Sequence, residues 1–350
     1  MLGSGKRPQA LLEMERFRSL YIDGTSRAKP KVRVDRIETE GESVWRVDVP
    51  VTNTLRGARA GHTLERHPAK KLIAEVNPEV SFGSHRPGWI DSTPHPRLIS
   101  RPANLLQRFD GRRGEPLWVY DNTRQAFDDD SWPWGLVGRI FNNRGESGTG
   151  TLIGDRLVAT AGHMVPWGDS PWWMQFVPAY FNGTSLFGSG VESYVSDARG
   201  FNISNVFIGY DYAVLRLYEP LGTSLGYFGY NSYSDAWNNL PIWSNIGYPG
   251  DIDNAQEPAF QKGFTIGADV GDGSGGDELE TENCDLNHGN SGGPMFAWWN
   301  DGTDPRVVAV VSSQLTNAQQ PPFPSPDDNV FAGGDAFANL CAWGRSNWPE

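Results

Sequence analysis

Residues 157–163 read Leu-Val-Ala-Thr-Ala-Gly-His, an apolar run of strand length that ends in a turn of small residues and a histidine. The run is short and has no helical periodicity, so it predicts a buried strand. Of the six histidines in the chain, only His163 follows a strand-like run in this way. A lone histidine is more often structural than catalytic, so its meaning depends on what accompanies it.

Short apolar runs recur on both sides of this stretch, separated by clusters of Gly, Asn, Asp and Pro. A helix is expected only near the end, over Phe337–Trp348. With 41 Gly, 25 Pro and 14 Trp in 350 residues, this rhythm predicts an all-β fold of barrel or sandwich type. The predicted strands lie at residues 136–141, 150–153, 157–160, 172–177, 213–217, 242–247, 258–266, 294–299 and 307–313.

Two further blocks turn His163 into a candidate catalytic base. Asp211 opens the strand-like run 213–217, and Ser291 lies in the turn Gly-Asn-Ser-Gly-Gly-Pro at 289–294. The order His, Asp, Ser is one of the orders that build a catalytic triad. A serine hydroxyl is a weak nucleophile at neutral pH, so His163 would take its proton while Asp211 fixes the histidine tautomer.

The glycines around Ser291 also have a chemical reason. A tight turn there would let the backbone N–H groups of Gly289 and Ser291 converge on one point, which predicts an oxyanion hole. Such donors stabilise negative charge where it develops in the transition state.

Together with residues 133–140, 148–153 and Cys284-Asp285, these blocks resemble the chymotrypsin-like peptidases, and within them the glutamyl-endopeptidase (V8-like) branch. The resemblance covers about residues 105 to 340. It implies a chymotrypsin-like double β-barrel, with barrel one at about 133–230 and barrel two at about 240–340 of a peptidase domain spanning 106–350. It also implies a secreted, monomeric serine endopeptidase that acts on polypeptide substrates without cofactor or metal.

The resemblance further implies that residues 1–105 form a pro-region and linker, so that the chain is a zymogen. Residues 1–110 hold 19 Lys and Arg against 13 Asp and Glu, a net charge of +6, whereas the remainder carries −18. The basic front segment is therefore expected to dock on the acidic body and to be removed between Pro102 and Trp132. Arg112-Arg113 is a candidate cut.

The resemblance places the substrate pocket at Asp285, His288, Val311, Ser312 and Ser313. Asp285 lies six residues before Ser291, the spacing of the aspartate that makes trypsin prefer Arg and Lys. Two readings of its side chain stay open: it selects a basic substrate residue, or it is a structural hydrogen-bond acceptor. Val311 stands where V8-like enzymes carry their glutamate-binding histidine. Asn290 replaces the aspartate with which animal trypsins pair a newly cut amino terminus, so that activation switch is expected to be missing.

Other function classes are disfavoured. The acidic body repels nucleic acids and anionic membranes, and no apolar run reaches the length of a membrane helix. A catalytically inactive module that binds peptide or carbohydrate on the same fold is the alternative, but all three triad residues are present.

The chain has two cysteines, Cys284 and Cys341, so one disulfide is possible and the sequence does not decide whether it forms. The acidic Gly-rich stretch 269–278 is either a Ca²⁺ loop or, as favoured here, a solvated loop.

Overall fold

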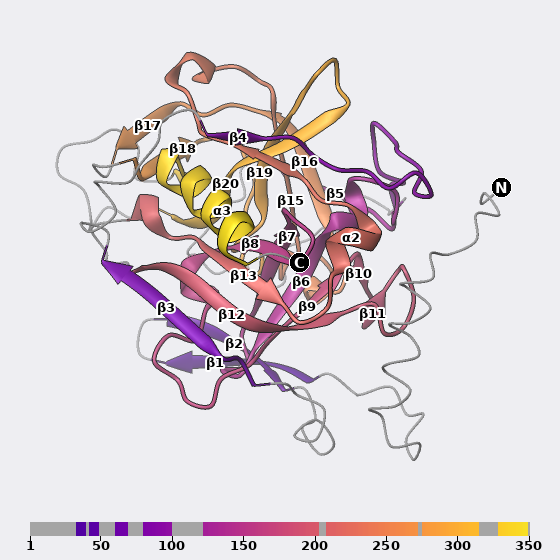
Figure 1. Ribbon diagram of the computed structural model, residues 1–350, viewed down its shortest axis with the longest axis vertical. Coiled ribbons are helices and arrows are strands. Elements are labelled where there is room, and N and C mark those ends of the chain that lie inside the picture. Colours follow the sequence, from indigo (N-terminus) through magenta and orange to yellow (C-terminus); the bar gives the residue numbers. More distant parts are fainter. Residues whose placement is uncertain are drawn as a thin grey trace.

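The computed structural model describes residues 33–39, 42–48, 60–68, 80–99, 122–202, 208–271, 275–314 and 328–348. The described residues form two large β-sheets, coloured mainly magenta to pink and orange in Figure 1, with turns and loops between their strands. The C-terminal helix α3 (Asp335–Asn347) contacts strands of both sheets. A short helix α2 (Leu221–Leu225) follows the last strand of the first sheet.

The first sheet closes into a barrel. Its strands run in the order β13-β8-β7-β6-β9-β12, and β12 also pairs with β13, which joins the two ends. Ile140, Val158, Phe176 and Leu215 are fully buried in its core. The strands are β6 (Val137–Asn142), β7 (Ser147–Leu152), β8 (Leu157–Thr160), β9 (Met174–Pro178), β12 (Ser193–Asn202) and β13 (Ala213–Leu217).

The second sheet runs in the order β17-β18-β21-β20-β19-β15-β16-β5. Phe264 and Phe331 stack in its core at 5.5 Å between ring centroids, near the fully buried Trp243. The short strand β14 (Gly229–Asn231) pairs with β20 and with β4. The other strands are β5 (Gln125–Ala126), β15 (Trp243–Gly247), β16 (Ala259–Phe264), β17 (Ala268–Gly271), β18 (Asp277–Thr281), β19 (Pro294–Trp299), β20 (Asp304–Gln314) and β21 (Asn329–Gly333).

Smaller elements complete the chain. Two hairpins stand apart from the large sheets: β1 (Arg33–Thr39) with β2 (Glu42–Asp48), and β10 (Tyr180–Phe181) with β11 (Thr184–Ser185). Five single turns of 3-10 helix are described: η4 (Trp134–Leu136), η5 (Gly162–Met164), η6 (Ile208–Tyr210), η7 (Asp235–Trp237) and η8 (Asp253–Ala255).

The predicted all-β fold with a C-terminal helix is confirmed. Several strands lie outside the predicted ranges, among them β12, β18 and β21. The sequence of β18 alternates two acidic residues, Glu278 and Glu280, with Leu279, and only Leu279 belongs to the core cluster. A strand this polar lacks the apolar run on which the prediction depends.

Part of the front segment is built into the body rather than connecting to it loosely. Strand β3 (Thr63–Pro68) lies parallel to β12, and β4 (Ser81–Phe82) pairs with β14. Ile90 is 6% exposed. The indole N–H of Trp132 donates to His85 O at 3.0 Å, and that of Trp134 donates to Thr93 O at 3.0 Å. Residues 80–99, which lie within the predicted pro-region and linker 1–105, are therefore packed against the body.

The two cysteines are separate, buried thiols. The disulfide that the sequence left open is not formed. Burial raises the pKa of both thiols, which is the behaviour of structural rather than reactive cysteines.

Candidate active site

His163 and Asp211 are brought together by the pairing of two strands in the first barrel. Strand β8 leads into the turn η5, which carries His163, and Asp211 lies two residues before the start of β13. Because Thr160 pairs with Ala213 across these strands, the two segments meet. His163 Nδ1 lies 2.6 Å from Asp211 Oδ2, and the His163 backbone N–H donates to Asp211 Oδ1 at 2.8 Å.

Asp211 accepts a third hydrogen bond from the other sheet. Ser312, on β20, donates its hydroxyl to Asp211 Oδ2 at 2.6 Å. Burial raises the pKa of the Asp211 carboxyl, but the charge and hydrogen bond of His163, with the bonds from Ser312 and the His163 backbone, outweigh it and lower the pKa. The carboxylate is thus held ionised at 4% exposure.

The same pair sets the basicity of His163. Burial lowers the pKa of the ring, but the charge of Asp211, its hydrogen bond and the charge of Glu146 outweigh that effect and raise the pKa above 6.5. The His163 side chain keeps 39% of its surface exposed. Asp211 therefore orients the ring through Nδ1, while part of the side chain stays open to solvent, where a general base can reach a substrate proton.

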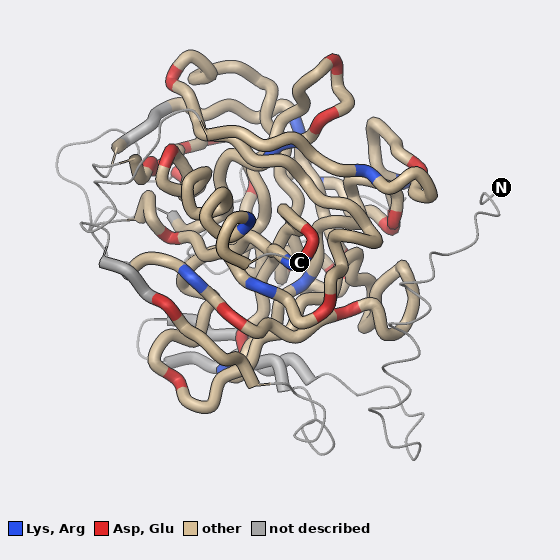
Figure 2. Tube along the Cα trace, viewed as in Figure 1, with Lys and Arg blue, Asp and Glu red and all other residues tan. Residues whose placement is uncertain are grey.

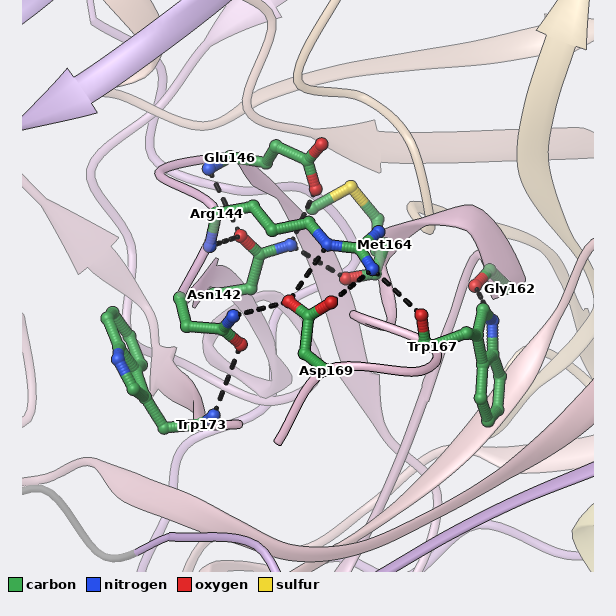
Figure 3. A network of polar contacts seen from close by, with 9 residues as sticks. Asn142, Arg144, Glu146, Gly162, Met164, Trp167, Asp169 and Trp173 are labelled. Carbon is green, nitrogen blue, oxygen red and sulfur yellow. Dashed lines mark hydrogen bonds and ion pairs between the residues drawn. The ribbon is translucent and has the colours of Figure 1, made fainter. Parts of the chain in front are cut away.

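The loop after β6 supports the turn that carries His163 (Figure 3). Asn142 donates from Nδ2 to Met164 O at 2.9 Å and to Glu146 Oε2 at 2.7 Å. Met164 directly follows His163 in the chain. Asn142 therefore fixes both the histidine turn and the carboxylate that raises the pKa of His163.

A second link in Figure 3 holds the chain beyond that turn. Arg144 Nη2 lies 2.8 Å from Asp169 Oδ1 and donates to Trp167 O at 2.9 Å. The Trp167 indole N–H in turn donates to Gly162 O at 2.7 Å. Gly162, before His163, and Trp167 and Asp169, after it, are thus connected to the loop that follows β6.

The turn containing Ser291 lies against the first barrel. Thr149, on β7, donates its backbone N–H to Ser291 O at 2.8 Å and its hydroxyl to Gly289 O at 2.7 Å. Gly292 has φ +84°, and a Cβ there would lie 2.2 Å from Thr160 Oγ1. Only glycine allows the Ser291 turn to approach the end of β8 this closely.

Within the described contacts, no hydrogen bond joins the His163 ring to the Ser291 hydroxyl. A Cβ on Gly292, the residue after Ser291, would lie 2.7 Å from the backbone N of Ala161, two residues before His163. The two segments are therefore neighbours. Catalytic hydrogen bonds are often long in a free enzyme and tighten when substrate binds.

The peptide groups around Ser291 have their carbonyls engaged and two N–H groups available. His288 O accepts from Gly250 N–H at 2.6 Å, and Asn290 O accepts from Gly293 N–H at 2.7 Å. In the described part of the chain, neither Gly289 N–H nor Ser291 N–H donates to a protein acceptor. These are the two donors that the sequence assigns to the oxyanion hole.

The residues assigned to the substrate pocket have different surroundings. Asp285 is 2% exposed and accepts at Oδ2 from the Thr123 backbone N–H at 2.7 Å and its hydroxyl at 3.2 Å. Asp285 is therefore a hydrogen-bond acceptor for Thr123 in this structure. Val311 is fully buried in the core cluster of the second sheet, and Ser312 binds Asp211. His288 and Ser313 are half-buried.

Sequence reasoning missed Thr123, Ser312 as a partner of Asp211, and Glu146. None lies in a recognisable motif, and each reaches its partner only through the fold. Among the described residues, no group of three or more His, Cys, Asp or Glu side chains is placed to hold a metal ion. The stretch 269–278 is only partly described. No helix in the described ranges is long and apolar enough to cross a membrane.

The trypsin family profile matches residues 122–326, more than half of the chain. The chain belongs to the trypsin family. Within that family, it is 31% identical over 134 residues to a glutamyl endopeptidase of Bacillus licheniformis. The match covers 37% of this chain and 41% of that protein, so the aligned part spans less than half of the relative's length.

A solved structure of a Glu endopeptidase in complex with MPD aligns with a TM-score of 0.50 at 18% sequence identity. The alignment covers 65% of this chain and 99% of that one. At this identity the likeness shows the fold alone, and it agrees with the two sheets and C-terminal helix described above. The fold class expected from the resemblance, a chymotrypsin-like fold, is therefore confirmed.

Proposed function

We propose that this member of the trypsin family is a serine endopeptidase in which Ser291 is the nucleophile, His163 the general base and Asp211 the residue that orients the histidine. The observation that carries the proposal is the His163–Asp211 contact of 2.6 Å beside a glycine turn that leaves two N–H groups available. That combination supplies a base, its orienting carboxylate and an oxyanion site.

The reaction follows from these roles. His163 Nε2 takes the hydroxyl proton as Ser291 Oγ bonds to the peptide carbonyl carbon, and the carbonyl oxygen becomes an oxyanion that accepts from Gly289 and Ser291 N–H. Collapse breaks the C–N bond, and His163 returns its proton to the leaving amine. Water then attacks the acyl-enzyme by the same route and releases Ser291.

Fluorophosphonate labelling and casein digestion test the proposal together, because only an activated serine reacts with the probe. The parent should be labelled and should digest casein, whereas Ser291→Ala should do neither. A parent that folds yet resists the probe would favour the rival reading, an inactive module that binds peptide or carbohydrate. A Ser291→Ala variant as active as the parent would remove Ser291 from the mechanism.

We further propose that the enzyme is secreted as a monomeric zymogen whose front segment is cut from the body. The net charges of +6 and −18 on the two parts support docking between them. Figure 2 shows acidic residues on the outer loops of the body, with fewer basic ones. The packing of residues 122–132 into the body supports a cut in the part of the Pro102–Trp132 range that precedes residue 122, which contains Arg112-Arg113 and lies outside the described residues.

A further inference from the structure

A β-turn next to the oxyanion site fixes the direction of one of its donors. Residues 249–252 form the turn, closed by Ile252 N–H donating to Pro249 O at 3.1 Å. Inside it, Gly250 N–H donates to His288 O at 2.6 Å. His288 O and Gly289 N–H belong to one planar trans peptide group, so they point in opposite directions. Holding the carbonyl toward Gly250 therefore directs the Gly289 N–H away from it.

Arg124 clamps this turn from the other side. Its guanidinium binds the Asp251 carboxylate through two hydrogen bonds of 2.9 Å and 2.6 Å, the bidentate geometry that makes such pairs strong and directional. The Arg124 side chain is 2% exposed, and its Nε donates to Asn122 Oδ1 at 3.1 Å. The Asp251 side chain keeps 22% of its surface exposed, so the pair is part-buried, and it ties residue 124 to the turn at 249–252.

The same short segment also contacts the other loop that leads to Gly289. Thr123 N–H donates to Asp285 Oδ2, and Asp285 lies four residues before Gly289. Asn290, which directly follows Gly289, is uncharged, and its amide donates only a long bond of 3.4 Å to Asn245 Oδ1. The Arg124–Asp251 pair is therefore a charged anchor of the turn that contacts the oxyanion loop.

We infer that Arg124 is a positioning residue for the reaction, acting through Asp251, Gly250 and the His288 carbonyl on the Gly289 donor. This inference rests on the proposed function and adds a residue pair that sets the direction of one oxyanion donor. When the pair is intact, the 288–289 peptide presents its N–H to the oxyanion. When the pair is broken, the turn loses its anchor and the peptide is free to rotate, which removes one donor while the triad stays in place.

Replacing Gly250 tests the last link directly. Gly250→Pro suits the second position of the turn but has no N–H and places a ring carbon against the His288 carbonyl. Gly250→Ala is the comparison: it keeps the N–H, but its Cβ would lie 3.2 Å from His288 O, so that carbonyl must give by a few tenths of an ångström. On a fluorogenic peptide chosen by profiling the parent, Gly250→Pro should lose about 10²–10³-fold in kcat, as loss of one oxyanion donor does, and Gly250→Ala should lose clearly less.

Arg124 tests the clamp. Arg124→Ala should lower kcat at least about 10-fold with a smaller change in KM, and Arg124→Lys should recover part of the loss. Arg306→Ala is the control for stability, because Arg306 also binds a carboxylate, Asp304, at 2.6 Å with little exposure. Arg306 lies near the start of β20, the strand that carries Ser312. Arg306→Ala should lower the melting temperature without lowering kcat.

The outcomes separate the two proposals. If the parent neither digests casein nor reacts with fluorophosphonate, the proposed function fails, and the coupling falls with it. If the parent is active and Gly250→Pro matches Gly250→Ala, only the coupling is overturned. If Gly250→Pro does not fold by circular dichroism, the Arg124 variants decide: kcat unchanged in Arg124→Ala overturns the inference, as does an equal kcat loss in Arg306→Ala.

Discussion

The Ser312 hydroxyl, on the second sheet, donates to Oδ2 of Asp211, on the first barrel, at 2.6 Å. Asp211 Oδ2 is also the atom that faces His163 Nδ1. The orienting carboxylate therefore belongs to both halves of the molecule, and its position depends on how they meet.

Ser312→Ala should lower kcat/KM about 10-fold, because a hydrogen bond to a buried charged group is worth about 1.5–3 kcal/mol. Removing the donor also raises the pKa of Asp211, since that bond helps to lower it. Steady-state kinetics on a fluorogenic peptide measures the loss. Ser313→Ala, one residue along the strand, is the control; an equal loss in both variants would assign the effect to the pocket rather than to Asp211.

Activity should fall toward acid pH, because the base must be neutral and its pKa is raised above 6.5. Glu146→Gln removes one charge that raises it while keeping a side-chain oxygen that can accept from Asn142. The acid limb of the kcat/KM profile should therefore move to lower pH. Glu192→Gln, whose charge is not among those that raise the His163 pKa, should leave the limb in place. No movement in Glu146→Gln would show that Glu146 does not act on His163.

Glu280 should make the protein less stable as pH rises. Burial, the Asp328 charge and the bond to Asp328 raise its pKa from 4.5 to about 7. An acid whose pKa is higher in the folded state is held protonated by folding, so stability falls as pH rises from the unfolded pKa to the folded one. Glu280→Gln should gain on the order of 1 kcal/mol relative to the parent between about pH 5 and pH 8.5.

Urea unfolding of Glu280→Gln and its parent at both pH values measures that gain. Glu282→Gln, an exposed neighbour, is the control and should show no such trend. A constant difference between parent and Glu280→Gln across the range would mean that Glu280 ionises normally in the folded protein.

Processing should leave residues 80–99 attached. Ser84 N–H donates to Asp304 Oδ1 at 2.8 Å, and the Trp132 and Trp134 indoles bind carbonyls of this segment. After a cut within 100–121, size exclusion under native conditions should give one species that separates into two chains on denaturation. Amino-terminal sequencing of active material identifies them. Full activity with residues 80–99 lost would show that the segment is dispensable.

The site could be proposed from sequence because its three blocks are local. The turn before His163 and the glycines around Ser291 are each visible in a few residues, and their order along the chain is a signal in itself. The strands β8, β13 and β19 match the predicted ranges for the same reason, since each is an apolar run bounded by turns.

The remaining features depend on contacts between distant residues. Arg124 and Asp251 are 127 residues apart, and nothing local marks either as a partner. The resemblance places Ser312 in the substrate pocket, whereas its contact with Asp211 depends on how the two sheets pack together. Strand β12 contains Asp, Arg and Gly, so its apolar content gives no strand signal, yet it closes the first barrel.

Trp132 and Trp134 are 3% and 2% exposed and donate their indole N–H groups to the backbone of residues 85 and 93. Departure of residues 80–99 would expose both rings to water and remove their hydrogen-bond acceptors. Because this segment stays with the body after the cut, the wavelength of tryptophan emission should not change during maturation, and a red shift would report that the segment had dissociated.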